Sequence, residues 1–200
     1  MNVNMLRKII ILITILHFIA GKSVCLATNF AADSSYDTCF TPGEDCSNKI
    51  IRAIAQAKQE ILVQAYSFSD ISIAEALVLA KTRGIDVKII LDKSQLRARY
   101  SLIPYFINHN IKLVIDNEPK IAHNKILVLD RQTVVGGSYN FTQAAKNKNA
   151  ENVMIINDPG FAEKYVKYWY KRQTKSKEIS MLKTNSRFKQ TKIYGKNNPN

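Results

Sequence analysis

The chain has 200 residues, of which 46% are apolar, and it carries a formal net charge of +13 at pH 7. A chain of this length and apolar content can bury a hydrophobic core, so a small peptide and a wholly disordered protein are excluded. We expect a single globular domain. The charge is unevenly distributed along the chain. Residues 171–200 hold nine basic residues and one acidic residue, whereas residues 28–170 hold 17 basic and 15 acidic residues. A uniformly basic domain is therefore also excluded.

Residues 1–27 have the pattern of a secretory signal peptide. Two basic residues precede an apolar run over residues 9–20, and a small-x-small sequence ending at Ala27 follows. We expect cleavage after Ala27 and a secreted protein. A transmembrane anchor is the alternative, but Thr14 and His17 interrupt the run, which is shorter than the roughly 18 to 20 apolar residues of a membrane span.

Two further cysteines, Cys39 and Cys46, flank the turn-like sequence Thr41-Pro42-Gly43. In an oxidising compartment these cysteines could close a small loop as a disulfide. The spacing equally allows two free thiols, because it does not give the distance between the two residues in space.

Helical and strand patterns alternate along residues 28–170. Apolar periodicity and capping residues predict helices over residues 47–59, 71–83 and 160–172, and a helix over residues 94–108 that Pro104 interrupts. Strands are predicted over residues 60–68, 85–91, 111–115 and 151–157, together with two strands between Ala122 and Phe141. This order predicts an α/β domain in which a mixed β-sheet is flanked by helices.

The C-terminal segment differs in composition from the domain. Residues 171–200 are rich in Lys, Asn and Ser and poor in apolar residues. We expect a disordered basic tail from Lys171 onward. Its charge would attract a polyanion or an anionic membrane surface, or the tail would only be a solvated chain end.

One predicted strand begins with an imidazole and an ammonium group. Side chains alternate across a strand, so His123 and Lys125 share one face with Leu127 and Leu129. Asp130, at an odd offset, belongs to the opposite face. We therefore expect His123 and Lys125 to project together and Asp130 to lie away from them.

The next predicted strand ends in Gly136-Gly137-Ser138-Tyr139-Asn140. By the same alternation Ser138 and Asn140 share a face, and the paired glycines allow a backbone or ligand to approach closely. If the two strands are neighbours, four polar groups converge. An imidazole can attack phosphorus while fixed donors stabilise the transition-state oxygens, so the pattern points to phosphoryl transfer.

These residues form a recognisable signature. His123-x-Lys125-x-x-x-x-Asp130, followed by six residues and Gly137-Ser138-x-Asn140, resembles the HKD motif of the phospholipase D superfamily. The order of strands and helices over residues 28–170 is similar to its small single-motif members, which include secreted phospholipases and endonucleases. The resemblance implies the phospholipase D-like fold.

The resemblance also implies a role for each residue of the motif. His123 would be the nucleophile and form a phosphohistidine, while Lys125 and Asn140 would hold the phosphoryl oxygens with help from Ser138. Asp130, counted with the catalytic motif, would mainly brace it. An acidic residue in the following strand, matched here by Glu151, would hold the second ring nitrogen of the nucleophile.

Hydrolysis through phosphohistidine also needs an acid for the leaving oxygen and a base for water. A second histidine does both in the superfamily, but near His109 the nearest lysine, Lys112, has the wrong spacing for a second motif. We expect a two-fold homodimer that brings two copies of His123 into one shared site. No metal-ligand pattern is present in the sequence, so we expect neither a metal nor a cofactor.

The interpretation that follows is a secreted phosphodiesterase of phospholipase D type. It would hydrolyse a membrane phospholipid such as phosphatidylcholine to phosphatidate and the free headgroup. The alternative is a nonspecific, metal-independent endonuclease with the same site and nucleic acid as substrate, and a third hypothesis is a noncatalytic binding module. No stable protein partner other than a second copy is expected.

Overall fold

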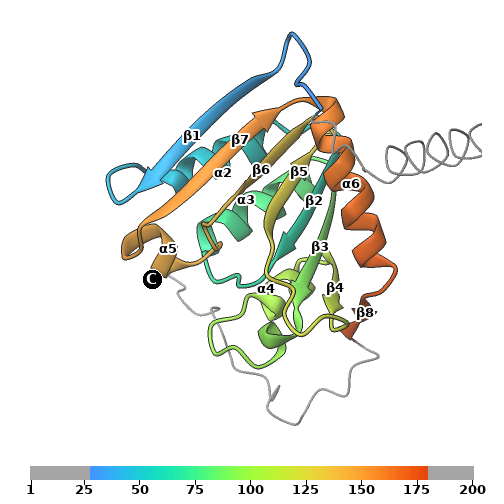
Figure 1. Ribbon diagram of the computed structural model, residues 1–200. Helices are drawn as coiled ribbons and strands as arrows, with labels where there is room; N and C mark the ends of the chain where they lie inside the picture. The colour runs from blue at the N-terminus through green and yellow to red at the C-terminus, as the bar shows by residue number, and fades with distance from the viewer. Residues whose placement is uncertain (1–27, 180–200) are drawn as a thin grey trace, which may run out of the picture.

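A computed structural model describes residues 28–179, and the expected signal peptide lies outside this range. The chain forms one mixed β-sheet flanked by helices, which confirms the predicted α/β fold (Figure 1). Its eight strands lie in the order β1-β7-β6-β5-β2-β3-β4-β8. The strands are β1 (Ser35–Thr41), β2 (Glu60–Ala65), β3 (Asp86–Asp92), β4 (Lys112–Asp116), β5 (Lys125–Leu129), β6 (Thr133–Gly137), β7 (Glu151–Asn157) and β8 (Lys177–Glu178).

Helices cover the two faces of the sheet unequally. They are α2 (Cys46–Gln56), α3 (Ile71–Thr82), α4 (Ile103–Asn108), α5 (Gln143–Asn147) and α6 (Pro159–Gln173), with a 3-10 turn at Lys93–Leu96. Helices α2 and α3 pack on one face, and α6 crosses the other (Figure 1). No helix within residues 28–179 has the length and apolarity needed to span a bilayer.

The core is divided into two layers because side chains alternate along each central strand. Val63 and Leu127 face the layer under α2 and α3, whereas Leu62 and Val128 face Trp169 of α6. All of these side chains are almost fully buried. Strands β2 and β5 therefore present apolar side chains to both layers.

Strand directions place several strand ends at one edge of the sheet. Strands β2, β3 and β4 are parallel, whereas β5 is antiparallel to β2 with Lys125 beside Ala65. Strands β5, β6 and β7 are antiparallel in turn. The ends of β2, β3, β4 and β6 and the starts of β5 and β7 therefore share one edge, called the site edge below.

Some predicted boundaries were wrong for local reasons. Helix α2 starts at Cys46 rather than at residue 47, because the carboxylate of Asp45 accepts the backbone N–H of Asn48. The helix expected over residues 94–108 is split, because Pro104 lies in the first turn of α4, where proline is favoured. Strand β1 was not predicted, and the disulfide between Cys39 and Cys46, left open by the sequence, ties it to α2.

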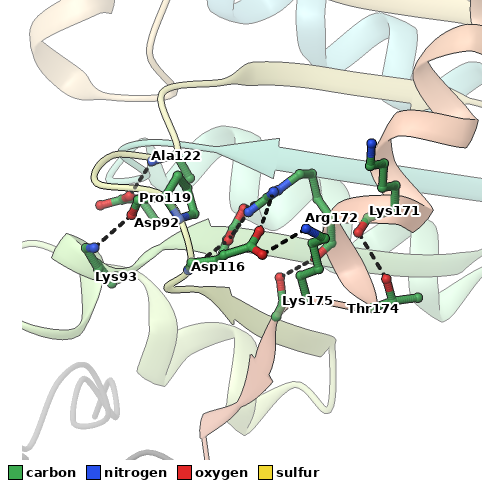
Figure 2. A network of polar contacts seen from close by, with 11 residues as sticks. Asp92, Lys93, Asp116, Pro119, Ala122, Lys171, Arg172, Thr174 and Lys175 are labelled. Carbon is green, nitrogen blue, oxygen red and sulfur yellow. Dashed lines mark hydrogen bonds and ion pairs between the residues drawn. The ribbon is translucent and has the colours of Figure 1, made fainter.

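The domain also continues past Tyr170, so the tail boundary expected at Lys171 is wrong. Helix α6 runs to Gln173, and β8 pairs with β4. Arg172 holds this end in place, because its Nη2 and Nε donate to the two carboxylate oxygens of Asp116 at 2.7 and 2.8 Å (Figure 2). Residues 180–200 of the expected tail lie outside the described range.

We predict that Arg172→Met lowers the free energy of unfolding by about 3 kcal/mol, because Asp116 is fully buried and would lose the cation that compensates its charge. In Arg172→Met/Asp116→Asn the unpaired charge is also removed, so part of the loss should be recovered. Urea unfolding followed by circular dichroism measures both changes.

Arg131→Met is the matched control. Arg131 pairs with Glu163 at 2.8 Å, but the two side chains are 49% and 39% exposed, so its loss should stay below about 1 kcal/mol. Equal destabilisation by the two arginine variants would contradict the importance assigned to the buried pair.

Candidate active site

His123 and Lys125 meet at the site edge, where β5 begins. The Lys125 Nζ lies 3.1 Å from Nδ1 and 3.2 Å from Nε2 of His123, and it also donates to the His123 carbonyl oxygen at 3.3 Å. An ammonium group only donates, so a ring nitrogen of His123 is the acceptor in this contact. The structure thus brings together the two groups that the alternation rule placed on one face.

Burial sets the electrostatics of this pair. Lys125 is only 8% exposed, and this desolvation lowers the pKa of its ammonium group, while the negative charge of Glu151 opposes the shift. The ring of Tyr66 packs against His123 with 4.5 Å between ring centroids, and the Lys125 Nζ lies 5.4 Å from the Tyr66 ring centroid. His123 itself is exposed, so its ring is accessible to a substrate.

Ser138 and Glu151 form a second polar pair on the neighbouring strands. The Ser138 Oγ donates to Glu151 Oε2 at 2.5 Å and accepts from the backbone N–H of Asn152 at 3.0 Å. The second carboxylate oxygen of Glu151 accepts from Asn149 at 2.9 Å. The expected bond from Glu151 to His123 is not among the hydrogen bonds within residues 28–179, where the carboxylate instead accepts from Ser138 and Asn149.

Gly137 turns the chain so that Ser138 meets Glu151. Its φ is +140°, and a Cβ at this position would overlap the backbone carbonyl oxygen of Asn152. Strand β6 ends at Gly137, so the strand alternation that was expected to align Ser138 and Asn140 does not extend that far. Asn140 is half-buried, and its Oδ1 has no hydrogen-bond partner in the described part of the chain.

Asp130 lies outside the site, at the opposite end of β5. A strand rises about 3.3 Å per residue, which places Asp130 roughly 17 Å from Lys125. Its carboxylate accepts the backbone N–H groups of Lys58, Gln59 and Glu60 at 2.8, 2.8 and 3.0 Å. Asp130 therefore fixes the entry into β2, and none of its hydrogen bonds within residues 28–179 goes to another motif residue. The structure does not bring it together with His123 and Lys125, and its bracing role stays a prediction.

Asp92 is a site residue that the sequence interpretation missed. It is almost fully buried at the end of β3, and its Oδ2 accepts the backbone N–H of Ala122, directly before His123, at 2.7 Å (Figure 2). Its Oδ1 accepts from Ser94 at 2.8 Å, and Lys93 donates to the carbonyl oxygen of Pro119 at 2.8 Å. The loop that carries His123 is thus tied to β3. The only signal in the sequence was an aspartate two residues before a serine at a strand end.

A cavity of about 220 Å³ extends from His123 and Lys125 along the face that carries α6. Its walls include the apolar side chains of Ile126, Met154 and Phe161. The space next to the polar pair could therefore accept an apolar part of a substrate.

One group of possible metal ligands occurs in the described range, away from this site. Side-chain ligand atoms of Cys39, Glu44 and Cys46 lie within 4.8 Å of one another. The two sulfur atoms are joined in the disulfide, so neither is a thiolate that could bind a metal ion.

Comparisons with known proteins agree with the motif. The family described as "Cardiolipin synthase, PLD-like domain" matches residues 50–172. The phospholipase D of Rickettsia prowazekii is 41% identical over 146 residues, which make up 73% of this chain and 71% of the relative. The mitochondrial cardiolipin hydrolase of Homo sapiens is 27% identical over 131 residues, which make up 64% of this chain and 52% of that protein.

A solved structure has the same architecture. Nuc from Salmonella typhimurium, a phospholipase D family member, matches with a TM-score of 0.70 and 37% sequence identity, over 72% of this chain and 97% of its own. The matched family range contains the His123–Lys125 pair and the Ser138–Glu151 pair. The chain therefore belongs to the phospholipase D superfamily and is a phosphodiesterase of that family.

Proposed function

We propose that this protein is a phospholipase D that hydrolyses a phosphatidylcholine-like phospholipid to phosphatidate and the free headgroup. The observation that carries the proposal is the exposed His123 imidazole held 3.1 Å from the buried ammonium of Lys125. The apolar side chains of Ile126, Met154 and Phe161 in the cavity beside this pair, and the phospholipase D name of the Rickettsia relative, support a lipid substrate.

The reaction would proceed in two displacements at phosphorus. A ring nitrogen of His123 attacks, the bond from phosphorus to the headgroup oxygen breaks, and this oxygen leaves with a proton from an acid. The group that gave its proton to the headgroup oxygen then takes a proton from water, and the water oxygen attacks phosphorus. The bond from phosphorus to the His123 nitrogen breaks, which releases phosphatidate and the free imidazole. The ammonium of Lys125, with the Ser138 and Asn140 side chains nearby, would stabilise the negative charge on the phosphoryl oxygens.

We also propose that the acid comes from His123 of a second copy in a two-fold homodimer. The other histidine in the described range, His109, lies between α4 and the start of β4, and its Nδ1 contacts the Tyr105 carbonyl oxygen at 2.8 Å. Strand β4 separates it from the site edge. Exposed Tyr36 and Met154, on the β1 and β7 part of the face that carries α6, offer an apolar surface for the second copy.

Export is the proposed localisation. A signal peptide over residues 1–27 would direct the chain out of the cytosol. The disulfide between Cys39 and Cys46 supports this proposal, because such bonds persist mainly in oxidising compartments.

The purified chain is expected to release choline from phosphatidylcholine vesicles in the presence of a chelator. His123→Ala should lower this rate by about a thousandfold or more, because the nucleophile is lost. Plasmid DNA incubated in parallel tests the endonuclease alternative. Cleavage of DNA without choline release would replace the phospholipase assignment, and loss of all activity in chelator would contradict a metal-independent reaction.

Mixing experiments test the shared site. If wild-type and His123→Ala chains are unfolded, mixed equally and refolded together, a site that needs two copies of His123 should leave about one quarter of the activity. Independent sites would leave half. His109→Ala is the control and should retain activity both alone and mixed, so a His109→Ala chain without activity would favour a site completed within one copy.

Asp92→Asn is expected to lower kcat for bis(p-nitrophenyl) phosphate about tenfold with little change in KM. The backbone N–H groups of Ser94 and Ala122 approach different carboxylate oxygens of Asp92, and in the variant an NH2 donor replaces one of these oxygens. One of the two bonds is then lost, and the loop carrying His123 is held less firmly. Asp130→Asn is the comparison, because it should lower the unfolding midpoint while the folded protein keeps its kcat. Unchanged kcat in Asp92→Asn would contradict the positioning role.

A further inference from the structure

Two short loops extend from the site edge, at the same end of the sheet as His123. The first, residues 97–101, joins the 3-10 turn to α4, and the second, residues 119–121, leads from β4 to His123 (Figure 1). We call residues 97–101 and 119–121 the rim loops. The hydrogen bond from Lys93 to the Pro119 carbonyl oxygen, at 2.8 Å, connects the bases of the two loops.

The base of the first rim loop is held against the end of β2. Gln95 accepts the backbone N–H of Phe68 at 3.2 Å, and Leu102 donates to the Phe68 carbonyl oxygen at 3.3 Å. Residues 97–101 therefore start and end at fixed points, and side chains between these points face solvent. Within the loop, the guanidinium of Arg99 lies 5.2 Å from the Tyr100 ring centroid.

Apolar and cationic side chains are exposed together on the rim loops. Tyr100 is 70% exposed and Ile121 is 51% exposed. Arg97, Arg99 and Lys120 are also exposed, and none of these three forms an ion pair within residues 28–179. The combination gives a cationic surface with apolar tips.

Nearby acidic groups do not neutralise this charge. Glu118, which precedes the second rim loop, already pairs with Arg172 at 2.7 Å and with Lys175 at 2.8 Å. Asp92 and Asp116 are buried and bound to backbone N–H groups and to Arg172. The rim cations are therefore free to interact with an anionic partner.

We infer that the rim loops dock the protein on an anionic phospholipid bilayer. Tyr100 and Ile121 would enter the interfacial region, while Arg97, Arg99 and Lys120 would bind lipid phosphates. Docking at this edge places His123, two residues beyond Ile121, at the depth of the headgroups. The inference rests on the proposed phospholipase function and adds the surface through which a lipid substrate reaches the site.

The apolar tips favour a bilayer over nucleic acid. An arginine beside an aromatic ring would suit base stacking as well as lipid binding. The exposed aliphatic side chain of Ile121 cannot stack in that way, but it gains free energy by leaving water for the acyl boundary of a membrane. DNA binding through the same loops is the competing outcome in the test.

The test uses the full chain with His123→Ala, so that vesicles are bound without turnover. Arg99→Glu/Tyr100→Ser is compared with Arg52→Glu/Leu79→Ser, a control in which Arg52 lies on α2 and Leu79 on α3. The control has the same charge change, and Leu79 is 61% exposed against 70% for Tyr100. Sedimentation with phosphatidylcholine vesicles containing about one third phosphatidylglycerol should show about tenfold or more weaker binding for the rim variant only. Equal unfolding midpoints show that both variants fold.

Equal vesicle binding by the two variants would overturn the inference. So would a rim variant that keeps vesicle binding but loses plasmid DNA binding, which would assign the loops to nucleic acid. A separate assay tests the proposed function with His123 intact. A chain that hydrolyses bis(p-nitrophenyl) phosphate but not vesicle phosphatidylcholine would refute the phospholipase activity. The vesicle-binding comparison would still decide whether the rim loops dock on a bilayer.

Discussion

A nearly buried ammonium group at the start of β5 constrains the rest of the site. Desolvation of Lys125 costs free energy unless acceptors and negative charge surround it. His123 supplies the acceptor, and Glu151 supplies the charge from two strands away. Both are available because β5, β6 and β7 are consecutive antiparallel neighbours, so the start of β7 returns to the edge where β5 begins. The order of the strands therefore brings the negative charge of Glu151 close enough to stabilise the Lys125 ammonium group.

Acidic side chains serve mainly as anchors for the backbone around the sheet. Asp130 accepts three backbone N–H groups at one edge, and Asp92 accepts two at the other. Asp158 does the same at the start of α6, where the Ser34 hydroxyl and the backbone N–H groups of Ala31 and Phe161 lower the pKa of its carboxyl to about 2. Of these three carboxylates only Asp92 lies at the site edge, and because two backbone N–H groups bind it, it forms no ion pair with the cations there within residues 28–179.

The sequence predicted those features that depend on local pattern. The central strands β2, β5 and β7 and the contact between His123 and Lys125 follow from apolar runs and from alternation within a few residues. Strand β1 could not be predicted in this way, because it is an exposed edge strand whose only sheet partner is β7, more than 100 residues further along. The hydrogen bond of Ser138 to Glu151 spans only 13 residues, but it depends on the positive φ of Gly137, which strand alternation does not predict.

The tail boundary failed for a related reason. Composition described residues beyond Tyr170 as basic and polar, but Arg172 is ordered because one buried carboxylate, on a strand more than 50 residues earlier, accepts its guanidinium group. The sequence shows charge but not the partner of each charge. Arg172 has a buried carboxylate partner and stabilises the site edge, whereas Arg97 and Arg99 in the rim loops form no ion pair within residues 28–179. The sequence does not distinguish these two kinds of arginine.

An edge with firmly held loop bases and exposed loop tips suits an enzyme with an insoluble substrate. The bonds of Asp92, Lys93 and Gln95 fix the bases of both rim loops, so contacts made at the tips need not displace the loop that carries His123. A nucleophile must stay within a few tenths of an ångström of its attack position, whereas a membrane contact tolerates large variation in depth and tilt. The loop bases meet the first requirement and the loop tips meet the second. The buried carboxylate of Asp92 binds the backbone just before His123, between the tip of the second rim loop and the nucleophile.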